Sequence, residues 1–579
     1  MKIVSFTPRS QVARAGRALA LAALLAYAFT GGGRLVGSDE VSMFELSLAL
    51  VRGSVAVPPG ATLAGPDGRH YTKNAATQAV LALPLVLAGE TAARAVPLSP
   101  PRRTLAARFV TSFFNAFVAA ILLGVFYVAA RRLGVSSRVA LWTAVLLGFS
   151  TPLWVYSKSF MAEPLQALGL LLALAGCAGV GDDPGRAGSG PRPASAWSER
   201  AAALGVFLAV SVKLSMLPLG LVCMVTLVGR PARAWLAPTV GLVLALAGHA
   251  LYNQARFGTL FETGYGVQVT AAAYTTPFLA GIYGLVISSG KGVLWFAPVL
   301  WIALPVWLTR AGATQLLQPP RDADVAVRRT AFSRFARLDA EARVRWGAAL
   351  AGLAALWLYG RFQHWAGDGS FGPRYLVPVL PLAFLVVALT IERGSRAIRR
   401  WAIVLGVLGG LVQVGGVAIY FGAQMREAGD YPYTLPLDHP RSMSDSHFNP
   451  RFSPIAGHWR LLLRNVGEHV RGAAPRIGAG RTTAVAAEVA AGTDAAPRSG
   501  AKPRDATLNV VGDAAASARL GIDSGDQEAL LHAIDFWWLY LIYAGFPAAP
   551  VWGVALALFV ATVLAARRAW RLAHREGKW

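Results

Sequence analysis

Residues 37–89 read, in three consecutive blocks, GSDEVSMFELSLALVRG, SVAVPPGATLAGPDGRHY and TKNAATQAVLALPLVLAG. An adjacent acidic pair, Asp39 and Glu40, stands near the start of this stretch, directly after a long apolar segment. The pattern then predicts a short apolar helix, a Pro- and Gly-rich turn region and a second apolar helix. Because ionisable side chains are costly within a bilayer, the acidic pair indicates the point where the chain leaves a membrane.

The composition of the whole chain agrees with a membrane protein. Of its 579 residues, 55% are hydrophobic and 15% are charged, and the mean hydropathy is +0.47. Soluble domains carry about 25% charged residues. The net charge of +25 comes from Lys and Arg in short segments between alternate apolar runs, as the positive-inside rule requires. We therefore expect a polytopic membrane protein, and the excess charge does not indicate nucleic acid.

The apolar runs predict an all-α bundle of about twelve transmembrane helices, with both termini on the inner side. The expected spans are 18–36, 108–130, 141–154, 165–180, 201–212, 216–228, 236–252, 293–308, 346–362, 375–391, 401–421 and 536–566. A cleavable signal peptide is the alternative for the first span. We prefer an uncleaved span, because the acidic pair needs an anchor at the membrane surface.

Three parts of the chain follow from this topology. Residues 1–421 form a transmembrane core with an outer-face loop at 37–100, which holds short amphipathic helices. Residues 422–534 form an extracytoplasmic segment, in which 473–529 is expected to be disordered because its Ala, Gly, Thr and Ser bury little apolar surface. Residues 535–579 form the last span and a basic inner tail. The two cysteines, Cys177 and Cys223, fall in apolar spans, which argues against a disulfide framework or a metal site of the CxxC kind.

The side chains that are hardest to explain by membrane insertion lie on the outer side. Ionisable groups at or just inside a bilayer are presumed functional. The catalytic candidates are Asp39 and Glu40, and the substrate-binding candidates are Tyr71, Lys73, Glu163, Lys213, Arg256, Tyr265, Trp365 and Arg374.

Asp39 and Glu40 have a second interpretation as helix-capping residues. Ser38 would be the N-cap of the following helix, and the two acids would face the positive end of its dipole. Glu45 forms a capping-box pattern with Ser42. The two interpretations are compatible, since a helix N-terminus can hold a carboxylate ionised for work as a general base.

The other candidates also have structural alternatives. Lys73 could snorkel at the end of a span, or it could bind phosphate as a compact point charge. Glu163 precedes a proline at the start of a span, so capping and active-site duty are equally open. Lys213 favours function, because lysine is expensive in so apolar a run. Arg374 could be an interfacial anchor, and Trp365 part of an aromatic belt.

Five segments, in this order, carry a resemblance to a known family. They are SDE at 38–40, YTKNAATQAVLALP at 71–84, STPLWVYSKSFMAEPL at 150–165, LYNQARFGTLFETGYG at 251–266 and WAGDGSFGPRYLVPVLP at 365–381. Together they resemble bacterial membrane glycosyltransferases of the GT-C fold. The nearest group is the family 39-like enzymes, related to protein O-mannosyltransferases and lipid A aminoarabinose transferases. The resemblance covers about the first 430 residues and the final span.

The resemblance implies a sugar donor linked to polyprenyl phosphate and a glycan, lipid or protein acceptor on the outer face of a bacterial inner membrane, with both termini cytoplasmic. By similarity, Asp39 matches the catalytic aspartate of loop one, and Lys73 matches the lysine of the family's Tyr-x-Glu-Lys-Pro stretch. This chain departs from that stretch, because Thr72 and Asn74 replace the acid and the proline.

The implied chemistry needs a single carboxylate. A glycosidase uses two because a sugar alkoxide leaves poorly, whereas a lipid phosphate leaves without protonation. Lys73, Lys213 or Arg374 would stabilise its charge. No cofactor is required on this scheme, and a divalent cation held by Asp39 and Glu163 is the alternative.

Two rival functions remain. A transporter or a flippase for lipid-linked sugars would place charges near the bilayer midplane, on broken helices in matched halves. A membrane scaffold would use the acidic pair for local capping alone. Full activity in an Asp39→Asn variant would exclude the transferase mechanism.

Overall fold

The computed structural model describes residues 9–59, 62–95, 100–179, 195–304, 338–367, 369–427, 447–477 and 530–575. The first half of the chain contains α1 (Arg9–Phe29), α2 (Ser38–Val51), α3 (Ala76–Leu81), α4 (Leu83–Arg94), α5 (Pro100–Thr111), α6 (Phe114–Arg132), α7 (Ser137–Phe149), α8 (Leu153–Tyr156), α9 (Glu163–Cys177), α10 (Ala196–Val212), α11 (Leu217–Val225) and α12 (Arg233–Phe257). The second half contains α13 (Phe278–Val286), α14 (Val293–Phe296), α18 (Ala340–Gly360), α19 (Leu380–Arg393), α20 (Arg396–Ala418), α21 (Phe421–Glu427), α24 (Pro454–Val470), α28 (Trp537–Tyr543) and α29 (Ala548–Arg575).

Other elements are short. The 3₁₀ turns are η1 (Leu214–Met216), η2 (Gly266–Val269), η3 (Ala271–Ala273), η4 (Pro298–Ile302), η5 (Arg374–Val379) and η7 (Pro450–Phe452). Strands β1 (Leu63–Ala64) and β2 (His70–Tyr71) pair antiparallel in a small hairpin. The protein is therefore an all-α membrane protein, as predicted.

Helix α9 lies at the centre of the bundle, and every one of its residues is buried. It packs along α10 and also contacts α6, α11 and η5. The backbones of α9 and α10 approach closely because glycines face the partner helix: a Cβ on Gly205 would collide with the backbone of Ala173, and one on Gly176 with that of Ala202. Small residues at helix contacts are the usual means of close packing in membranes. The first residue of α9, Glu163, is thereby held in the protein interior.

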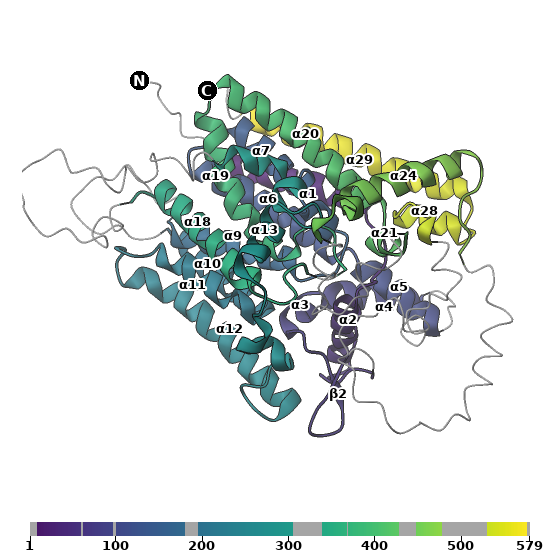
Figure 1. Cartoon of the computed structure of the whole chain (residues 1–579), viewed down its shortest axis with the longest axis horizontal. Coiled ribbons are helices and arrows are strands. Elements are labelled where there is room, and N and C mark those ends of the chain that lie inside the picture. Colours follow the sequence, from purple (N-terminus) through teal and green to yellow (C-terminus); the bar gives the residue numbers. More distant parts are fainter. Residues whose placement is uncertain are drawn as a thin grey trace, which may run out of the picture.

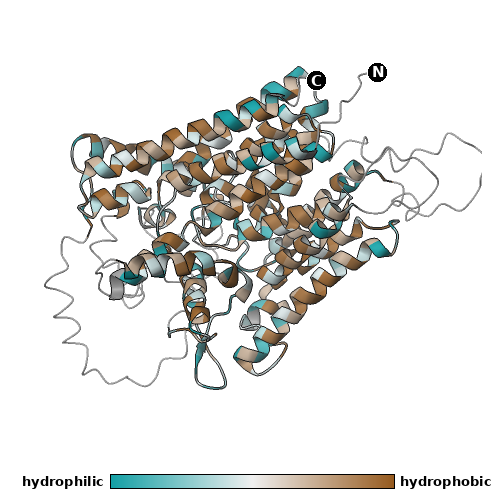
Figure 2. Ribbon diagram, turned by 180° about the vertical axis from the view of Figure 1, so that it is seen from behind, coloured by the Kyte–Doolittle hydropathy of each residue, from teal (hydrophilic) through white to brown (hydrophobic). Residues whose placement is uncertain are grey.

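The outer surface of the bundle is apolar. Leu236 and Leu251 on α12, Val407 on α20 and Leu556 on α29 each expose more than half of their surface. Figure 2 shows hydrophobic residues along the long helices and hydrophilic residues in the β hairpin. Because exposed leucine and valine belong in lipid, these faces are consistent with a bilayer around the bundle.

By length and composition, seven helices in the described residues can cross a membrane, compared with about twelve predicted spans. They are Ser10–Phe29, Ala76–Arg94, Arg103–Arg132, Arg233–Phe257, Arg374–Arg393, Arg396–Ala418 and Ala548–His574. Shorter apolar helices are Ser137–Phe149, Glu163–Cys177 and Leu214–Val225. One of the seven, Ala76–Arg94, falls in the predicted outer loop, where Ala82 separates α3 from α4.

Several predicted spans differ from the helices that form. The span at 18–36 ends with α1 at Phe29, and the span at 141–154 is divided between α7 and α8. The span at 293–308 breaks at Ala297, which separates α14 from η4, and its residues from 305 lie outside the described ranges. The span at 536–566 is two helices, α28 and α29, separated by a turn at Gly545 with φ +88°. The span at 401–421 ends at Ala418, because Ile419 is extended. Breaks of this kind depend on single residues, which a hydropathy window averages away.

The helices α2 to α5 and the β hairpin gather at one end of the bundle, at the lower right in Figure 1, and we call this the loop end. Helix α29 packs along α1, so the last described helix returns to the first. Between residues 422 and 477, α24 packs on α20 and α21, and the Ile477 N–H donates to the carbonyl oxygen of Tyr543 at 3.0 Å. The predicted disorder at 473–529 lies outside the described residues from 478 onward.

Candidate active site

The two acids in the first turn of α2, Asp39 and Glu40, contact different groups. Glu40 is 2% exposed and accepts three backbone N–H groups, from Phe160 at 2.5 Å, Gly37 at 2.6 Å and Val36 at 3.0 Å. Burial raises the pKa of Glu40, although these donors partly offset the rise. Its carboxylate therefore joins segment 36–37 to the loop before α9. These contacts hold Glu40 in place, and the catalytic role predicted for it stays a prediction.

The structure also revises the predicted capping of α2. Gly37 is the N-cap, without a side-chain cap, and Glu40 accepts its N–H. Glu45 does not complete a capping box with Ser42; it binds Arg108, with 2.9 Å between Oε1 and Nη2.

Asp39 faces a group of cations. Its Oδ2 lies 3.3 Å from Arg374 Nη2, and its Oδ1 lies 3.7 Å from Lys73 Nζ. Its side chain is 24% exposed. Burial on its own would raise the pKa of Asp39, but the charges of Arg374, Lys73 and Lys213 outweigh it and lower the pKa to about 2. Asp39 is therefore ionised at neutral pH.

Arg374 connects Asp39 to a second, deeper carboxylate. Its Nε lies 2.5 Å from Oε1 of Glu163, which is 1% exposed at the start of α9. Arg374 is the first residue of η5 and follows Gly372, whose φ of +71° turns the chain against the ring of Phe296. A side chain at Gly372 would strain this turn. Local backbone geometry and burial thus hold Arg374 between the two acids.

Lys213 and Lys73 belong to the same group of charges, because both lower the pKa of Asp39. Lys213 is extended where α10 ends and η1 begins, and its Nζ lies 5.6 Å from the centre of the Tyr375 ring. Lys73 follows β2, and its Nζ lies 5.8 Å from the centre of the Tyr265 ring. We call Asp39, Lys73, Glu163, Lys213 and Arg374 the Asp39 cluster. Its three basic side chains outnumber its two acidic ones, which suits an anionic ligand.

Two predicted binding residues support the cluster. Arg256 is 3% exposed and donates to the carbonyl oxygen of Thr72, so it braces the loop that carries Lys73. Tyr265 donates its hydroxyl to Asn74 Oδ1 at 3.4 Å. Burial, with the charge of Asp39, raises the pKa of Tyr265, so its hydroxyl stays protonated.

Two other predicted residues lie apart from the cluster. Tyr71 donates to Asp67 Oδ2 at 2.7 Å within the β hairpin, and its ring packs on Phe257. Trp365 is 1% exposed and stacks on Phe448 at 5.7 Å, so it is a packing residue and not part of an aromatic belt. Neither residue contacts Asp39 or Arg374.

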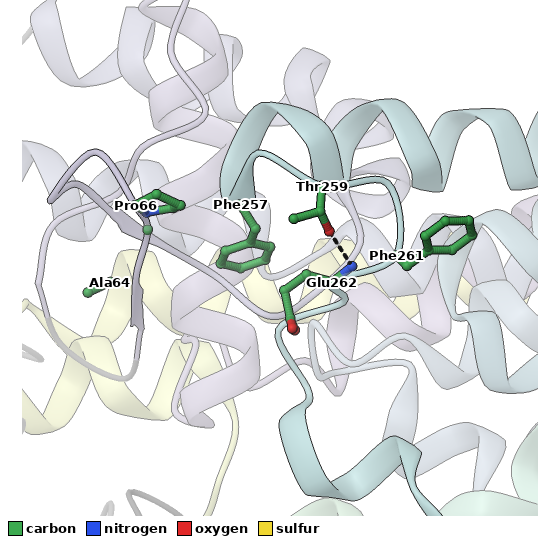
Figure 3. A pocket seen from close by; sticks show the side chains of 7 residues that line it. Ala64, Pro66, Phe257, Thr259, Phe261 and Glu262 are labelled. Atoms are coloured by element: carbon green, nitrogen blue, oxygen red, sulfur yellow. Dashed lines mark hydrogen bonds between the residues drawn. The ribbon is translucent and has the colours of Figure 1, made fainter.

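An open groove lies beside the hairpin. It is lined by Ala64, Gly65, Pro66, Phe257, Thr259, Phe261 and Glu262 (Figure 3). The Glu262 N–H donates to the Thr259 hydroxyl at 3.1 Å and closes the loop that forms one wall. The cluster cations do not line this groove.

The divalent cation that is the alternative would lie between Asp39 and Glu163, where the structure places Arg374. Each carboxylate has one oxygen on this guanidinium, and its other oxygen is not bound to it. Among the described residues, no group of three His, Cys, Asp or Glu side chains could hold a metal ion.

Sequence reasoning missed a second ionic group at the loop end. Asp535 Oδ1 lies 2.6 Å from Arg34 Nη2, and its Oδ2 lies 2.7 Å from Lys158 Nζ. The available signal was an acid directly before the aromatic run FWWLYLIY, that is, an ionisable residue at the boundary of an apolar segment.

Replacing Glu40 with glutamine is expected to lower the free energy of unfolding by about 1–3 kcal/mol, because the new NH₂ group cannot accept one of the backbone N–H groups. Thermal unfolding of the purified protein in detergent measures this. Glu45→Gln is the matched control on the same helix, where the carboxylate is 23% exposed. If Glu40→Gln unfolds at the wild-type temperature, the anchoring role is wrong.

Comparison with models of protein families finds no match, and comparison with curated proteins finds none. Two solved structures are similar to this chain, both of ArnT from Cupriavidus metallidurans. The crystal structure of ArnT bound to undecaprenyl phosphate is 18% identical, with a TM-score of 0.43 over 79% of this chain and 71% of ArnT. The apo structure is 18% identical, with a TM-score of 0.42 over 76% of this chain and 72% of ArnT. The likeness is too remote for residues of ArnT to be matched onto residues of this chain.

Proposed function

We propose that this protein transfers a sugar from a polyprenyl-phosphate donor to an acceptor hydroxyl at the outer face of the membrane, with inversion and with Asp39 as general base. The observation that carries the proposal is an ionised, partly accessible Asp39 set among Arg374, Lys73 and Lys213 at the loop end. A lipid phosphate needs cations near its leaving oxygen, and the acceptor needs a carboxylate. One of the ArnT structures is bound to undecaprenyl phosphate, a lipid of the proposed donor class.

The phosphate of the donor would sit on the cations of the Asp39 cluster. Lys73 exposes 36% of its side chain, compared with 10% for Arg374, and its 3.7 Å contact with Asp39 is loose enough to exchange for a phosphate oxygen. Lys213 is the second donor of positive charge. Arg374 is committed to Glu163 at 2.5 Å and keeps its place while the lysines turn to the ligand.

Donor binding would also make Asp39 a stronger base. With a pKa of about 2, the carboxylate of the free protein holds a proton poorly, and general bases work best with a pKa near the operating pH. A phosphate anion beside the lysines offsets the positive charge that depresses this pKa, so the pKa of Asp39 rises in the complex. The base is thus strengthened when the donor is in place.

The proposed step moves one proton and one sugar. The acceptor oxygen attacks the anomeric carbon from the side opposite the phosphate, and its proton passes to an Asp39 oxygen. The bond from the anomeric carbon to the phosphate oxygen breaks, and its electron pair leaves with the polyprenyl phosphate. Attack from the opposite side inverts the anomer, and no group on this chain needs to protonate the leaving phosphate.

The test uses full-length protein reconstituted in liposomes with polyprenyl-phosphate-linked sugars. We expect acceptor-dependent release of free polyprenyl phosphate, together with a product of inverted anomeric configuration. If the lipid-linked sugar crosses the bilayer intact and is not consumed, the flippase alternative holds. A comparison of envelope glycans in cells with and without this protein then identifies the acceptor.

Replacing Lys73 with glutamine is expected to raise the donor KM and lower kcat/KM by about 10–100-fold, as for the loss of a charged contact of about 1.5–3 kcal/mol. Steady-state kinetics over a range of donor concentrations measures the change. Arg69→Gln is the matched control, because Arg69 is 71% exposed on the same hairpin and pairs only loosely with Asp67, at 3.8 Å. Equal kinetics in Lys73→Gln and the wild type would remove Lys73 from the donor site.

A further inference from the structure

We infer that Asp535, from the C-terminal segment, is a positioning residue for Asp39, because it joins the two segments that together hold Glu40. The inference rests on the proposed function in so far as it concerns catalysis. Asp535 is 6% exposed at the side chain and uses both carboxylate oxygens, one on Arg34 and one on Lys158. These partners are separated from it by 501 and 377 positions in the chain.

Each partner stands two residues before a segment that donates to Glu40. Arg34 precedes Val36, whose N–H donates to Glu40 Oε2, and Lys158 precedes Phe160, whose N–H donates to Glu40 Oε1. The Asp535 carboxylate therefore joins the two segments at Arg34 and Lys158, and the Glu40 carboxylate joins them two residues later, at Val36 and Phe160. Since Glu40 directly follows Asp39, the position of Asp39 depends on both bridges.

The ionic contacts of Asp535 with Arg34 and Lys158, which we call the Asp535 bridge, are held in place by further contacts. Lys158 Nζ also donates to the carbonyl oxygens of Val417 at 2.6 Å and Asp535 at 2.8 Å. The Asp535 N–H donates to the carbonyl oxygen of Ala418 at 2.7 Å, so the group sits on the end of α20. The Arg34 guanidinium lies 4.8 Å from the Tyr420 ring centre and 4.4 Å from that of Tyr540. Buried ionic groups are often no more stabilising than apolar side chains of similar volume, so we infer that this one serves to fix geometry.

Loop 157–162 has two further anchors, which make the inference testable. Gln78 donates to the carbonyl oxygen of Phe160, and Asn115 donates to that of Met161, each at 2.7 Å. If these two contacts were sufficient, loss of Asp535 would leave Asp39 in place. If the bridge is needed, Asp39 shifts, and a shift of about 1 Å can lower the rate about 100-fold.

The experiment compares Asp535→Asn with Glu468→Gln in reconstituted full-length protein. Glu468 binds His532 at 2.8 Å and so docks the same C-terminal segment, but without a contact to segment 34–37 or loop 157–162. We expect Asp535→Asn to lower kcat by about 10–100-fold with little change in donor KM, and Glu468→Gln to retain wild-type kcat. The acid limb of the kcat/KM profile should also move to higher pH in Asp535→Asn, because Asp39 moves away from Arg374.

Hydrogen exchange separates this inference from the proposed function. The amides of Val36, Gly37 and Phe160 should exchange faster in Asp535→Asn than in Glu468→Gln, whether or not transfer is observed. If the wild type transfers no sugar while this difference holds, the proposed function fails and the positioning role of Asp535 survives. Wild-type exchange and kcat in folded Asp535→Asn, or equal losses in both variants, would overturn the inference.

Gly32→Ala serves where Asp535→Asn does not fold. A Cβ at Gly32 would lie 3.2 Å from Lys158 Cε, so the variant pushes on the bridge while every charge keeps its partner. We expect the same direction of change in kcat and in amide exchange, at a smaller amplitude. Wild-type values for both measurements would count against the inference.

Discussion

Replacing Asp39 with asparagine is expected to lower kcat by about 10²–10⁴-fold, the contribution of a positioned general base. The amide keeps the shape of the side chain but cannot accept the proton of the acceptor hydroxyl. Asp39 is 24% exposed, and its Oδ1 lies 3.7 Å from Lys73 Nζ, which is a loose contact. The variant should therefore fold and insert normally. Release of polyprenyl phosphate from a lipid-linked donor measures the effect.

The matched control for this variant is Asp67→Asn. Asp67 is an acid of the same loop, but it binds Tyr71 in the hairpin and lies away from the cluster cations. Asp67→Asn should retain wild-type kcat. An Asp39→Asn variant with full activity would remove the proposed base and with it the mechanism.

The pH dependence of the wild type is a second measurement on Asp39. Its folded pKa of about 2 is below the unfolded value of about 3.9, so its ionised contacts stabilise the fold above about pH 4 and are lost as the pH falls through 2. The kcat/KM profile reports the pKa values of the free enzyme. Because the pKa of Asp39 is about 2, this profile should have no acid limb between about pH 5 and 8. The limb of kcat should lie at higher pH, because the bound phosphate raises the pKa of Asp39.

Replacing Arg374 with glutamine is expected to have the largest effect on stability. The change leaves Glu163, 1% exposed, without its cationic partner, and breaking a buried ion pair in this way costs about 3–5 kcal/mol. Activity should fall as well, because Arg374 lowers the pKa of Asp39 more than the other cations do. Thermal unfolding in detergent and donor turnover measure the two effects.

A double variant distinguishes the buried ion pair from a general loss of packing. Glu163→Gln together with Arg374→Gln should recover part of the lost stability, because the uncompensated charge is gone. Arg393→Gln is the surface control: Arg393 pairs with Glu341 but is 62% exposed, so its loss should cost about 0–1 kcal/mol. If the double variant is no more stable than Arg374→Gln, the ion pair is not what holds η5 to α9.

Local sequence patterns determined the class of the fold and the start of the candidate site. Long apolar runs with basic segments between them require membrane helices, because backbone groups in lipid must be satisfied within the helix. The acid pair after an apolar run placed Asp39 in the first turn of α2, and Pro164 placed Glu163 at the start of α9. These features depend on residues that are neighbours in the chain, so they can be predicted without a structure.

Only the tertiary structure decided which acid faces the cations. Adjacent residues on a helix point about 100° apart, so one of the pair at 39 and 40 turns inward, and the packing of loop 157–162 selects Glu40. The Arg374 contacts with Glu163 and Asp39 span 211 and 335 positions. Asp535 reaches Arg34 over 501 positions. Contacts at such separations depend on how whole helices pack, and no local period of the sequence records them.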